Sequence, residues 1–448
     1  MKNFIKKLIP KKILLLYHYL VARCAAAWYG FPAKNMVIIG ITGTKGKTST
    51  ANFVWAALTA GGYKTGAITT ANIRIGEDEI LNTYHMTMPG RFTIQKLLRQ
   101  MAQEGCTHCV VETTSEGIQQ HRTVGVYYDI AVFTNLSPEH LEAHGGDFEE
   151  YKRMKGKMFE ALSGHPRKNI GGREISTAII ANGDSQHSAY YLAFPADKKI
   201  TFGLGEGMDY RATNIRPSAT GVDFEVGGKK FNIHILGAFN VYNALPSIII
   251  SRLMDIDDAI IAKGLAGLKK IPGRMEIIDE EQKFKVIVDY AHEQQSIVHV
   301  LQTAHAMREP EAKIVILLGA EGGGRDKAKR ALLGEFSARL ADYVVVSNVD
   351  PYEDDPRQIL EDIAIVAEKF GKVRGINLFV IEDRREGIRK ALSLAHEKDI
   401  VLITGKGAEQ SIIIGGKRSP WDDRVVVREE LKKQLASEIS PAKTHTPA

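Results

Sequence analysis

The stretch that decides the fold is Ile38-Ile39-Gly40-Ile41-Thr42-Gly43-Thr44-Lys45-Gly46-Lys47-Thr48-Ser49. An apolar run ends in a glycine-rich turn that carries Gly-Lys-Thr, and a helical pattern follows. In such a turn, backbone N–H groups and a helix N-terminus surround phosphates. Lys47 would reach the β- and γ-phosphates, and the Thr48 hydroxyl would bind Mg²⁺. The match to the general pattern is incomplete, because its first glycine falls on Ile41. The stretch nevertheless predicts an ATP site formed by Gly43, Thr44, Lys45, Gly46, Lys47, Thr48 and Ser49.

The composition indicates an ordinary globular protein. The chain has 448 residues, of which 44% are hydrophobic and 25% are charged, so two or three domains are expected. The net charge of +6 suits anionic small substrates and does not indicate a nucleic-acid partner. Three cysteines, an odd and low number, argue against a disulfide framework and favour a reducing cytoplasm. Cys106 and Cys109 flank His108 at metal-like spacing, but they lead into an apolar run and are predicted to be buried in a strand.

Residues 1–34 begin with a basic stretch and continue with an apolar one. Five lysines (Lys2, Lys6, Lys7, Lys11 and Lys12) precede an apolar stretch over residues 13–29. That stretch contains His18 and Arg23, and it ends in bulky residues, so neither a membrane span nor a secretory signal is predicted. We expect an amphipathic helix. Two roles stay open, namely docking on the chain's own body and peripheral contact with an anionic membrane surface.

Strand-like and helical runs alternate over most of the chain, which predicts an α/β fold with mostly parallel sheets. In the first part, strands are expected at 37–41, 108–112 and 129–134, and helices at 48–60 and 92–103. Short β-like pieces at 221–226 and 230–235 flank Gly227-Gly228, a hairpin signal. The second part has strands at 285–290, 314–318, 343–347, 377–381 and 400–404, and its clearest helices are at 328–340, 356–370 and 385–396.

Four segments follow from this pattern. They are an N-terminal basic helical segment (1–34), a central doubly wound ATP-binding domain (35–270), a C-terminal Rossmann-like domain (271–435) and a disordered tail (436–448).

Four further clusters can carry chemistry. Glu112 ends an apolar strand and is placed for Mg²⁺, although a surface carboxylate would look the same. His140 lies in the loop after the strand at 129–134, where it is either a metal ligand or structural. Lys155 belongs to a basic run at 151–159 that reads by itself as a solvated helix face. The glycine turn at 319–324 is a weak anion signal.

Taken together, these sequence motifs resemble those of the Mur ligase family, the ATP-dependent amide-forming enzymes of peptidoglycan precursor synthesis. The resemblance runs from about residue 36 to about residue 433 and is greatest to the tripeptide-forming branch, which adds the third residue of the stem peptide. The matching stretches are 42–49, 112–115, 120–122, 134–145, 151–159, 237–244, 272–276, 289–292, 319–330, 383–384 and 405–410.

The resemblance implies roles for individual residues. Lys47, Lys155 and His140 would be catalytic, and Thr48, Glu112, His140 and Lys155 would hold metal, with Lys155 carbamylated. Asn240, Arg274, Asp289 and His292 would join the phosphate loop in binding ATP. The acid substrate and the amino acid would be bound by Thr87, Arg91, Thr113, Thr114, Arg122, Asp350, Tyr352, Gly405 and Glu409. A carboxylate would attack the γ-phosphate, and an amine would then displace phosphate from the acyl phosphate.

Three departures from the family pattern stand out. About 35 residues precede the phosphate loop, too few for the family's N-terminal UDP-binding domain. The diaminopimelate motif Asp-Asn-Pro-Arg is replaced by Val349-Asp350-Pro351-Tyr352, so the arginine is missing. Two interpretations of Asp350 and the nearby carboxylates stay open: they favour a cationic amino acid such as lysine, or they are ordinary surface groups. Glu293-Gln294-Gln295 and Ala408 also differ from the family residues.

Three functions are therefore compared. The first is a cytoplasmic, monomeric ligase that uses ATP and Mg²⁺ to join an amino acid to a UDP-muramoyl-peptide-like acid. The second is a ligase of the same architecture on another acid, of the folylpolyglutamate, poly-γ-glutamate or cyanophycin type. The third is a non-catalytic ATP-binding subunit, against which the joint presence of Lys47, Glu112, His140 and Lys155 argues.

Overall fold

The structure, a computed structural model, describes residues 10–139, 141–324 and 327–439. The chain divides into two compact units. The first comprises residues 1–216, 221–234 and 238–269, and the second comprises 217–220, 235–237 and 270–448. The division at 269/270 lies one residue before the expected boundary, and the N-terminal helix belongs to the first unit.

The first unit is built on one large sheet with the strand order β13-β12-β11-β10-β9-β6-β1-β5-β2-β3-β4. Its central strands, from β2 to β10, pair in parallel. β1, β5, β6 and β9 are buried along their whole length, as expected for parallel strands that are covered on both faces. The strands are β1 (Val37–Thr42), β2 (Thr65–Ile68), β3 (Asn72–Ile75), β4 (Asp78–Leu81), β5 (His108–Glu112), β6 (Ile130–Phe133), β9 (Ala178–Asn182), β10 (Lys198–Gly203), β11 (Tyr210–Ser218), β12 (Gly221–Val226) and β13 (Lys229–Ile233).

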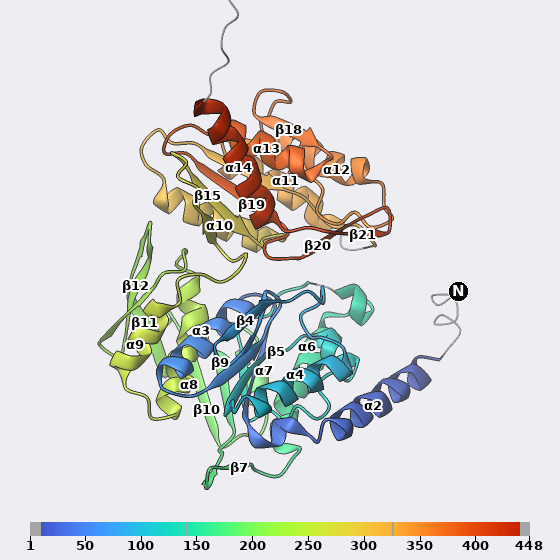
Figure 1. Cartoon of the computed structure of the whole chain (residues 1–448), viewed down its shortest axis with the longest axis vertical. Helices are drawn as coiled ribbons and strands as arrows, with labels where there is room; N and C mark the ends of the chain where they lie inside the picture. Colours follow the sequence, from blue (N-terminus) through green and yellow to red (C-terminus); the bar gives the residue numbers. More distant parts are fainter. Residues whose placement is uncertain (1–9, 140, 325–326, 440–448) are drawn as a thin grey trace, which may run out of the picture. The chain divides into compact units, whose positions relative to one another are not determined.

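Helices cover both faces of this sheet (Figure 1). One face carries α3 (Lys47–Ala60), which packs against α8 (Asn240–Leu253) and α9 (Asp258–Gly267). The other carries α4 (Arg91–Gln103), α5 (Ser115–Gln119), α6 (Phe148–Glu160) and α7 (Ser188–Leu192), whose apolar side chains form the main core with β1, β5, β6 and β9. Short 3₁₀ turns lie at Pro32–Asn35, Leu141–His144 and Ala161–Ser163, and β7 (Asn169–Ile170) pairs with β8 (Arg173–Glu174).

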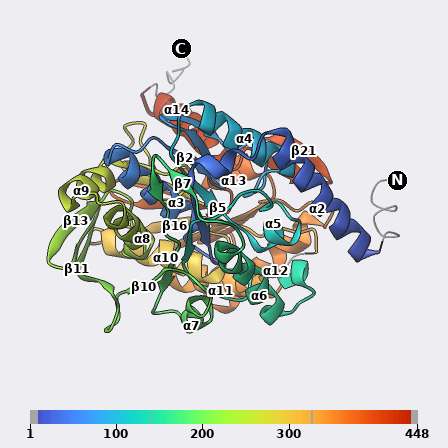
Figure 2. The same cartoon turned by 90° about the horizontal axis from the view of Figure 1, so that it is seen from below.

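The N-terminal helix α2 (Lys11–Trp28) lies beside α4, as Figure 2 shows. Its small residues Ala22, Ala25 and Ala26 are buried, which lets the helix approach the first unit closely. Docking on the chain's own body is thus confirmed for this face of the helix.

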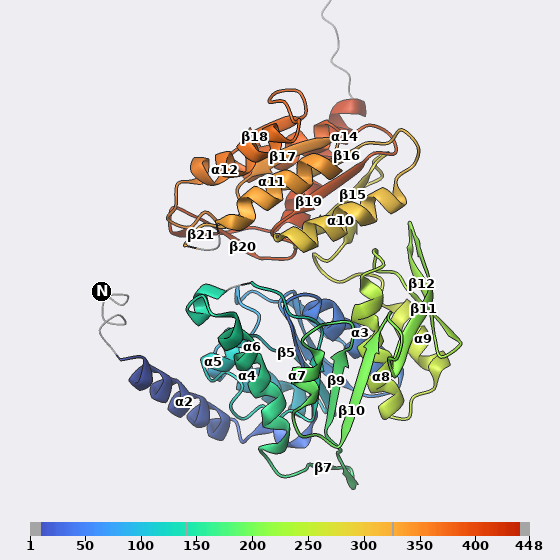
Figure 3. The ribbon, with the colours of Figure 1, turned by 180° about the vertical axis from the view of Figure 1, so that it is seen from behind.

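The second unit is a smaller sheet with the strand order β14-β15-β19-β16-β17-β18, in which only β14 is antiparallel. Figure 3 shows α10, α11 and α12 on one face, and α13 and α14 cover the other. The strands are β14 (Glu276–Ile278), β15 (Lys285–Asp289), β16 (Ile314–Leu318), β17 (Tyr343–Ser347), β18 (Leu378–Ile381) and β19 (Ile400–Thr404), with a hairpin of β20 (Ser411–Ile414) and β21 (Lys417–Pro420). The helices are α10 (Gln294–Met307), α11 (Ala328–Leu340), α12 (Pro356–Lys369), α13 (Arg384–Ser393) and α14 (Asp423–Ile439).

The α/β prediction is confirmed, and Cys106 and Cys109 are buried as expected. One prediction is wrong in part. Residues 436–439 are not a disordered tail, because they continue α14, whose buried Val427 and Leu431 hold the helix on the second unit. Residues 440–448 lie outside the described part of the chain.

Candidate active site

The phosphate loop occupies the middle of the large sheet. β1 lies between β5 and β6, with Ile41 paired to Glu112 and Thr42 paired to Phe133. Because the three strands are parallel, their carboxyl ends open at one edge, where ligands bind in open α/β sheets. The loop follows β1 at this edge, and α3 begins at Lys47.

Two glycines of the loop are required by its geometry. Gly43 has φ 148° and Gly46 has φ 82°, a region that favours glycine. A Cβ at Gly43 would collide with the Thr134 hydroxyl, and one at Gly46 would collide with the side-chain oxygen of Asn243. Sequence reasoning did not find Asn243, because only the fold brings α8 against the loop.

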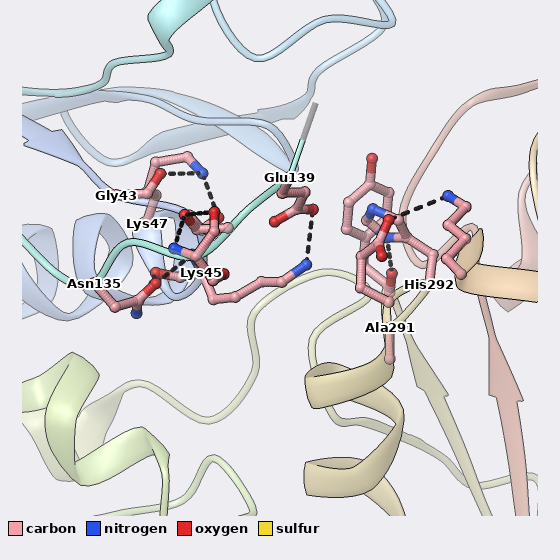
Figure 4. Close-up of polar contacts among 12 residues, drawn as sticks. Gly43, Lys45, Lys47, Asn135, Glu139, Ala291 and His292 are labelled. Carbon is pink, nitrogen blue, oxygen red and sulfur yellow. Dashed lines mark hydrogen bonds and ion pairs between the residues drawn. The ribbon is translucent and has the colours of Figure 1, made fainter. Parts of the chain in front are cut away.

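Residues after β6 brace the loop from one side. Asn135 accepts from the N–H of Lys45 at 2.8 Å and donates to its carbonyl at 3.1 Å. Thr44 shares hydrogen bonds with Ser137 and contacts the Tyr151 hydroxyl at 3.2 Å. Lys45 forms an ion pair with Glu139 at 2.7 Å, shown in Figure 4. The predicted loop residue Lys45 therefore has a structural partner, whereas the predicted metal ligand His140 lies outside the described residues.

Two lysines converge on the carbonyl of Gly43. Lys47 turns back over the loop and donates to Gly43 at 3.1 Å and to Thr44 at 2.9 Å (Figure 4). Lys155, which is 2% exposed, donates to the same Gly43 carbonyl at 2.9 Å. Burial and then the charge of Lys47 hold the pKa of Lys155 well below its ordinary value of 10.5. The basic run by itself suggests a solvated helix face, but α6 buries Lys155, in agreement with the exception that the family resemblance implied for this residue.

Glu112 connects the phosphate loop to a line of threonines. Its carboxylate is 2% exposed and accepts from the Thr48 hydroxyl at 2.9 Å and from the Thr70 N–H at 2.8 Å. The Thr70 hydroxyl lies 2.8 Å from that of Thr87, a predicted acid-binding residue. Glu112 is therefore not a surface carboxylate, which was the alternative left open by the sequence. Thr70 connects Glu112 to Thr87, and nothing in the sequence indicated this connection.

Arg91 and Arg122 lie close together at the N-terminus of α4. Arg91 donates to the Gln120 carbonyl at 2.9 Å, and Arg122 donates to the Gln120 side chain at 2.7 Å and to the Met88 carbonyl. Burial and then the charge of Arg122 lower the pKa of Arg91. The bond to the Gln120 carbonyl is made by Nε of Arg91, and the terminal nitrogen Nη2 of Arg91 is buried without a hydrogen-bond partner among the described residues. Two like charges with an unsatisfied donor form a place for a carboxylate.

Three other predicted residues of the first unit have clear structural partners. The Thr113 hydroxyl contacts that of Tyr128 at 2.8 Å in the core. Thr114 caps α5 by accepting from the Gly117 N–H. Asn240 is buried at the start of α8 and accepts from Asn243 at 2.8 Å, so it lies near the phosphate loop.

In the second unit, Arg274, Asp289 and His292 gather at the carboxyl end of β15. The Asp289 carboxylate accepts from the N–H groups of Met275 and Ala291, both at 2.7 Å. The guanidinium of Arg274 lies 4.3 Å from the centre of the Tyr290 ring. His292 contacts the Tyr290 carbonyl at 2.7 Å through Nδ1, so this nitrogen is the donor.

The predicted amino-acid residues lie in neighbouring loops of the same unit. Asp350 is buried, pairs with Lys406 at 2.8 Å and accepts from the Ile413 N–H at 2.8 Å. Lys406 also pairs with Glu409 at 2.6 Å. Burial lowers the pKa of Lys406, but Glu409 and Asp350 outweigh it and leave the pKa raised. Asp350 thus holds the loop together, and Lys406 is a partner that the sequence did not reveal.

Tyr352 and Gly405 adopt unusual backbone conformations in these loops. Tyr352 has φ 55°, and its ring lies against Gly323 of the glycine turn. Gly405 has φ 109° and donates to the Asp289 carbonyl at 3.2 Å. Both residues therefore shape the carboxyl edge of the second sheet.

Comparison with known proteins defines the class. Residues 41–251 match the Mur ligase middle domain, and residues 273–407 match the Mur ligase, glutamate ligase domain. A UDP-N-acetylmuramyl-tripeptide synthetase from Roseiflexus sp. (strain RS-1) is 36% identical over 92% of this chain and 81% of that protein. A UDP-N-acetylmuramoyl-L-alanyl-D-glutamate–2,6-diaminopimelate ligase from Geobacillus kaustophilus is also 36% identical, over 92% and 82%. The chain belongs to the Mur ligase family of ATP-dependent, ADP-forming ligases of peptidoglycan synthesis, as the sequence predicted.

Solved structures agree on the fold. A UDP-N-acetylmuramoyl-L-alanyl-D-glutamate–2,6-diaminopimelate ligase superposes with a TM-score of 0.59 at 28% identity, over 89% of this chain and 79% of that one. The folylpolyglutamate synthase of Mycobacterium tuberculosis superposes with a TM-score of 0.68, over 92% and 94%. Its identity is 18%, so this second likeness concerns the fold alone.

Proposed function

We propose that this chain joins an amino acid to the terminal carboxylate of a UDP-N-acetylmuramoyl-peptide-like acid, through an acyl phosphate, with ATP and Mg²⁺. The observation that carries the proposal is the convergence of Lys47 and Lys155 on the Gly43 carbonyl, with the buried Glu112 hydrogen-bonded to Thr48 at the start of α3. The names of the relatives support the choice of acid.

The first step is phosphoryl transfer. A carboxylate oxygen of the acid forms a bond to the γ-phosphorus, the bond between that phosphorus and the β,γ-bridging oxygen breaks, and ADP leaves. Negative charge is spread over the phosphoryl oxygens during transfer. Lys47 can exchange its carbonyl partners Gly43 and Thr44 for these oxygens, and the loop N–H groups add fixed dipoles.

The residues around Glu112 fit a magnesium ion. Its buried carboxylate is hydrogen-bonded by the neutral donors Thr48 and Thr70, and oxygen ligands are those that Mg²⁺ prefers. A bound Mg²⁺ would neutralise charge on the phosphate oxygens. Thr48 and Glu112 would hold it, with His140 as a further predicted ligand.

Lys155 has the chemistry that carbamylation needs. Only a neutral amine attacks carbon dioxide, and burial with the nearby Lys47 charge favours the neutral form. The amine nitrogen forms a bond to the carbon of CO₂ and loses a proton, which leaves a carboxylate on the side chain. This added carboxylate would face Lys47 and supply a further oxygen ligand for the metal.

Arg91 and Arg122 would bind a carboxylate of the acid, and Thr87 would place that acid beside the Thr48–Glu112 line. In the second step the amine nitrogen bonds to the acyl carbon and loses a proton, while the carbon–oxygen bond breaks and phosphate leaves. The proposed nucleotide contacts in the second unit are Arg274, Asp289 and His292. The proposed amino-acid contacts are Tyr352, Gly405 and Glu409. Thr113 and Thr114 would act by shaping the strand end below the acid.

A product screen tests the function. The purified chain is incubated with ATP, Mg²⁺, the common amino acids plus diaminopimelate, and either UDP-N-acetylmuramoyl-dipeptide, folate or poly-γ-glutamate. We expect ADP, phosphate and an amide product with the muramoyl acid only. Lys47→Ala should abolish turnover while the protein stays folded, whereas the exposed Lys64→Ala should not. Turnover with another acid alone, or unchanged turnover in Lys47→Ala, contradicts the proposal.

A further inference from the structure

The helix α2 presents an apolar face that the described part of the chain leaves uncovered. Ile13, Leu16, Tyr17, Leu20 and Trp28 are between 53 and 80% exposed. Such a run of large exposed apolar residues along one helix marks an interaction surface rather than the scattered apolar residues of an ordinary surface. We call these five residues the α2 stripe.

The α2 stripe and the docked face lie on opposite sides of the helix. At 100° per residue, the five residues fall within an arc of about 120°, and the buried Ala22, Ala25 and Ala26 fall on the other side. The helix is therefore held on the first unit by its small residues, while its bulky residues point away. The stripe is not an unfinished part of the unit's own core.

The segment that carries the stripe is strongly basic. Residues 1–34 contain seven lysines and arginines and no acidic residue, and the first acidic residue of the chain is Glu77. Five of these lysines precede or begin the helix. Arg23 and Lys34 lie near its other end, where both cations sit over the Phe31 ring.

We propose that the α2 stripe binds the surface of an anionic lipid bilayer, with α2 lying in the plane of the interface. Apolar insertion together with lysines at the lipid headgroups is the physical basis of such binding. Among the described helices none has the length and apolar character to cross a membrane, so the helix would lie on the bilayer. A second copy of the chain is a poorer occupant, because it would set two segments with seven basic residues each against one another.

The stripe is next to the proposed acid-binding residues. Tyr17 opposes, as a minor contribution, the lowering of the Arg91 pKa by burial and Arg122, and the Tyr19 ring packs edge-on against His121 with 5.6 Å between the ring centres. Membrane binding would thus hold this part of the first unit close to the bilayer. The inference stands on the helix alone and does not depend on the ligase reaction.

Vesicle cosedimentation of the full chain tests the proposal. We expect binding to vesicles of phosphatidylcholine mixed with phosphatidylglycerol, and little binding to phosphatidylcholine alone. The double variant Leu16→Glu/Leu20→Glu should lose binding, while Val373→Glu/Ile376→Glu, which alters two exposed apolar residues of the second unit, should retain it. Lys11→Gln/Lys12→Gln should weaken binding roughly 30-fold, and added salt should weaken it further.

Two further measurements distinguish a loss of membrane binding from a loss of folding. Thermal unfolding of each variant should match the unaltered chain, because every substituted apolar residue is exposed. Tryptophan emission should shift to the blue on binding, and Trp28→Phe should remove most of that shift. Absence of binding, equal binding to both kinds of vesicle, or retained binding by Leu16→Glu/Leu20→Glu would overturn the proposal. So would a dimer in solution that this double variant dissociates.

Discussion

Replacing Lys155 with methionine should strongly reduce ligase activity while it changes the stability of the fold only slightly. The side chain makes one hydrogen bond, to Gly43 at 2.9 Å, whose loss costs about 1 kcal/mol. Methionine has a similar volume and removes the buried amine, which offsets that loss. We therefore expect a change in the free energy of unfolding of at most about 1–2 kcal/mol, or a few degrees in Tm. Ligation should fall roughly 100-fold or more, because the carbamate that is proposed to help hold the metal cannot form.

The pH dependence of stability gives an independent check. The pKa of Lys155 is lowered in the folded state, so unfolding takes up a proton between that pKa and 10.5. In this window the contribution of Lys155 to stability rises with pH and is lost as pH falls. Methionine has no group that titrates in this window. The free energy of unfolding of Lys155→Met should therefore rise relative to that of the unaltered chain as pH is lowered. Chemical denaturation at several pH values measures this difference.

The assays are ADP release and ¹³C NMR with labelled bicarbonate. The unaltered chain should show a carbamate signal that Lys155→Met lacks, and formate should restore part of the activity of Lys155→Ala. The exposed neighbour Lys157→Met serves as the matched control. Full activity of Lys155→Met, or a loss of activity that only follows unfolding, would refute the reasoning.

Three further changes have defined outcomes. Glu112→Gln keeps both hydrogen bonds but removes the buried charge, so the Mg²⁺ concentration for half-maximal rate should rise about tenfold or more; an unchanged Mg²⁺ titration would contradict this. Gly46→Ala should weaken ATP binding in calorimetry because its Cβ meets Asn243, whereas Gly62→Ala, with φ 87° and open space, should bind ATP normally; equal affinities would remove the steric explanation. Lysine should exceed diaminopimelate in kcat/KM, and Tyr352→Arg should narrow the gap by roughly tenfold; a native preference for diaminopimelate would show that another basic group replaces the arginine.

Much of the fold could be predicted because its strands are short apolar runs that end in distinctive residues. The strand that ends at Glu112 and the helices after the phosphate loop follow from local periodicity and glycine positions. The hairpin β20–β21 and the helix α14 were missed. The buried Asp423 at the start of α14 reads as a surface residue until its pairing with Arg384 is known.

The candidate site could be located from the sequence where its residues are neighbours in one motif, as in Lys47-Thr48. It was not predictable where distant elements meet. Nothing next to Lys155 in the sequence shows that α6 points it at the Gly43 carbonyl. Likewise the charge of Asp350, which the sequence offered to a cationic substrate, is already paired with Lys406, 56 residues away.

The acyl phosphate is the intermediate on which the proposed mechanism depends, and transfer of ¹⁸O from the acid tests whether it forms. With both carboxylate oxygens of the acid labelled, mass spectrometry of the products should find one ¹⁸O in each released phosphate, none in ADP, and the other in the new amide. This transfer should depend on the amino acid and disappear in Lys47→Ala. Unlabelled phosphate, or label carried into AMP, would contradict the mechanism proposed for this chain.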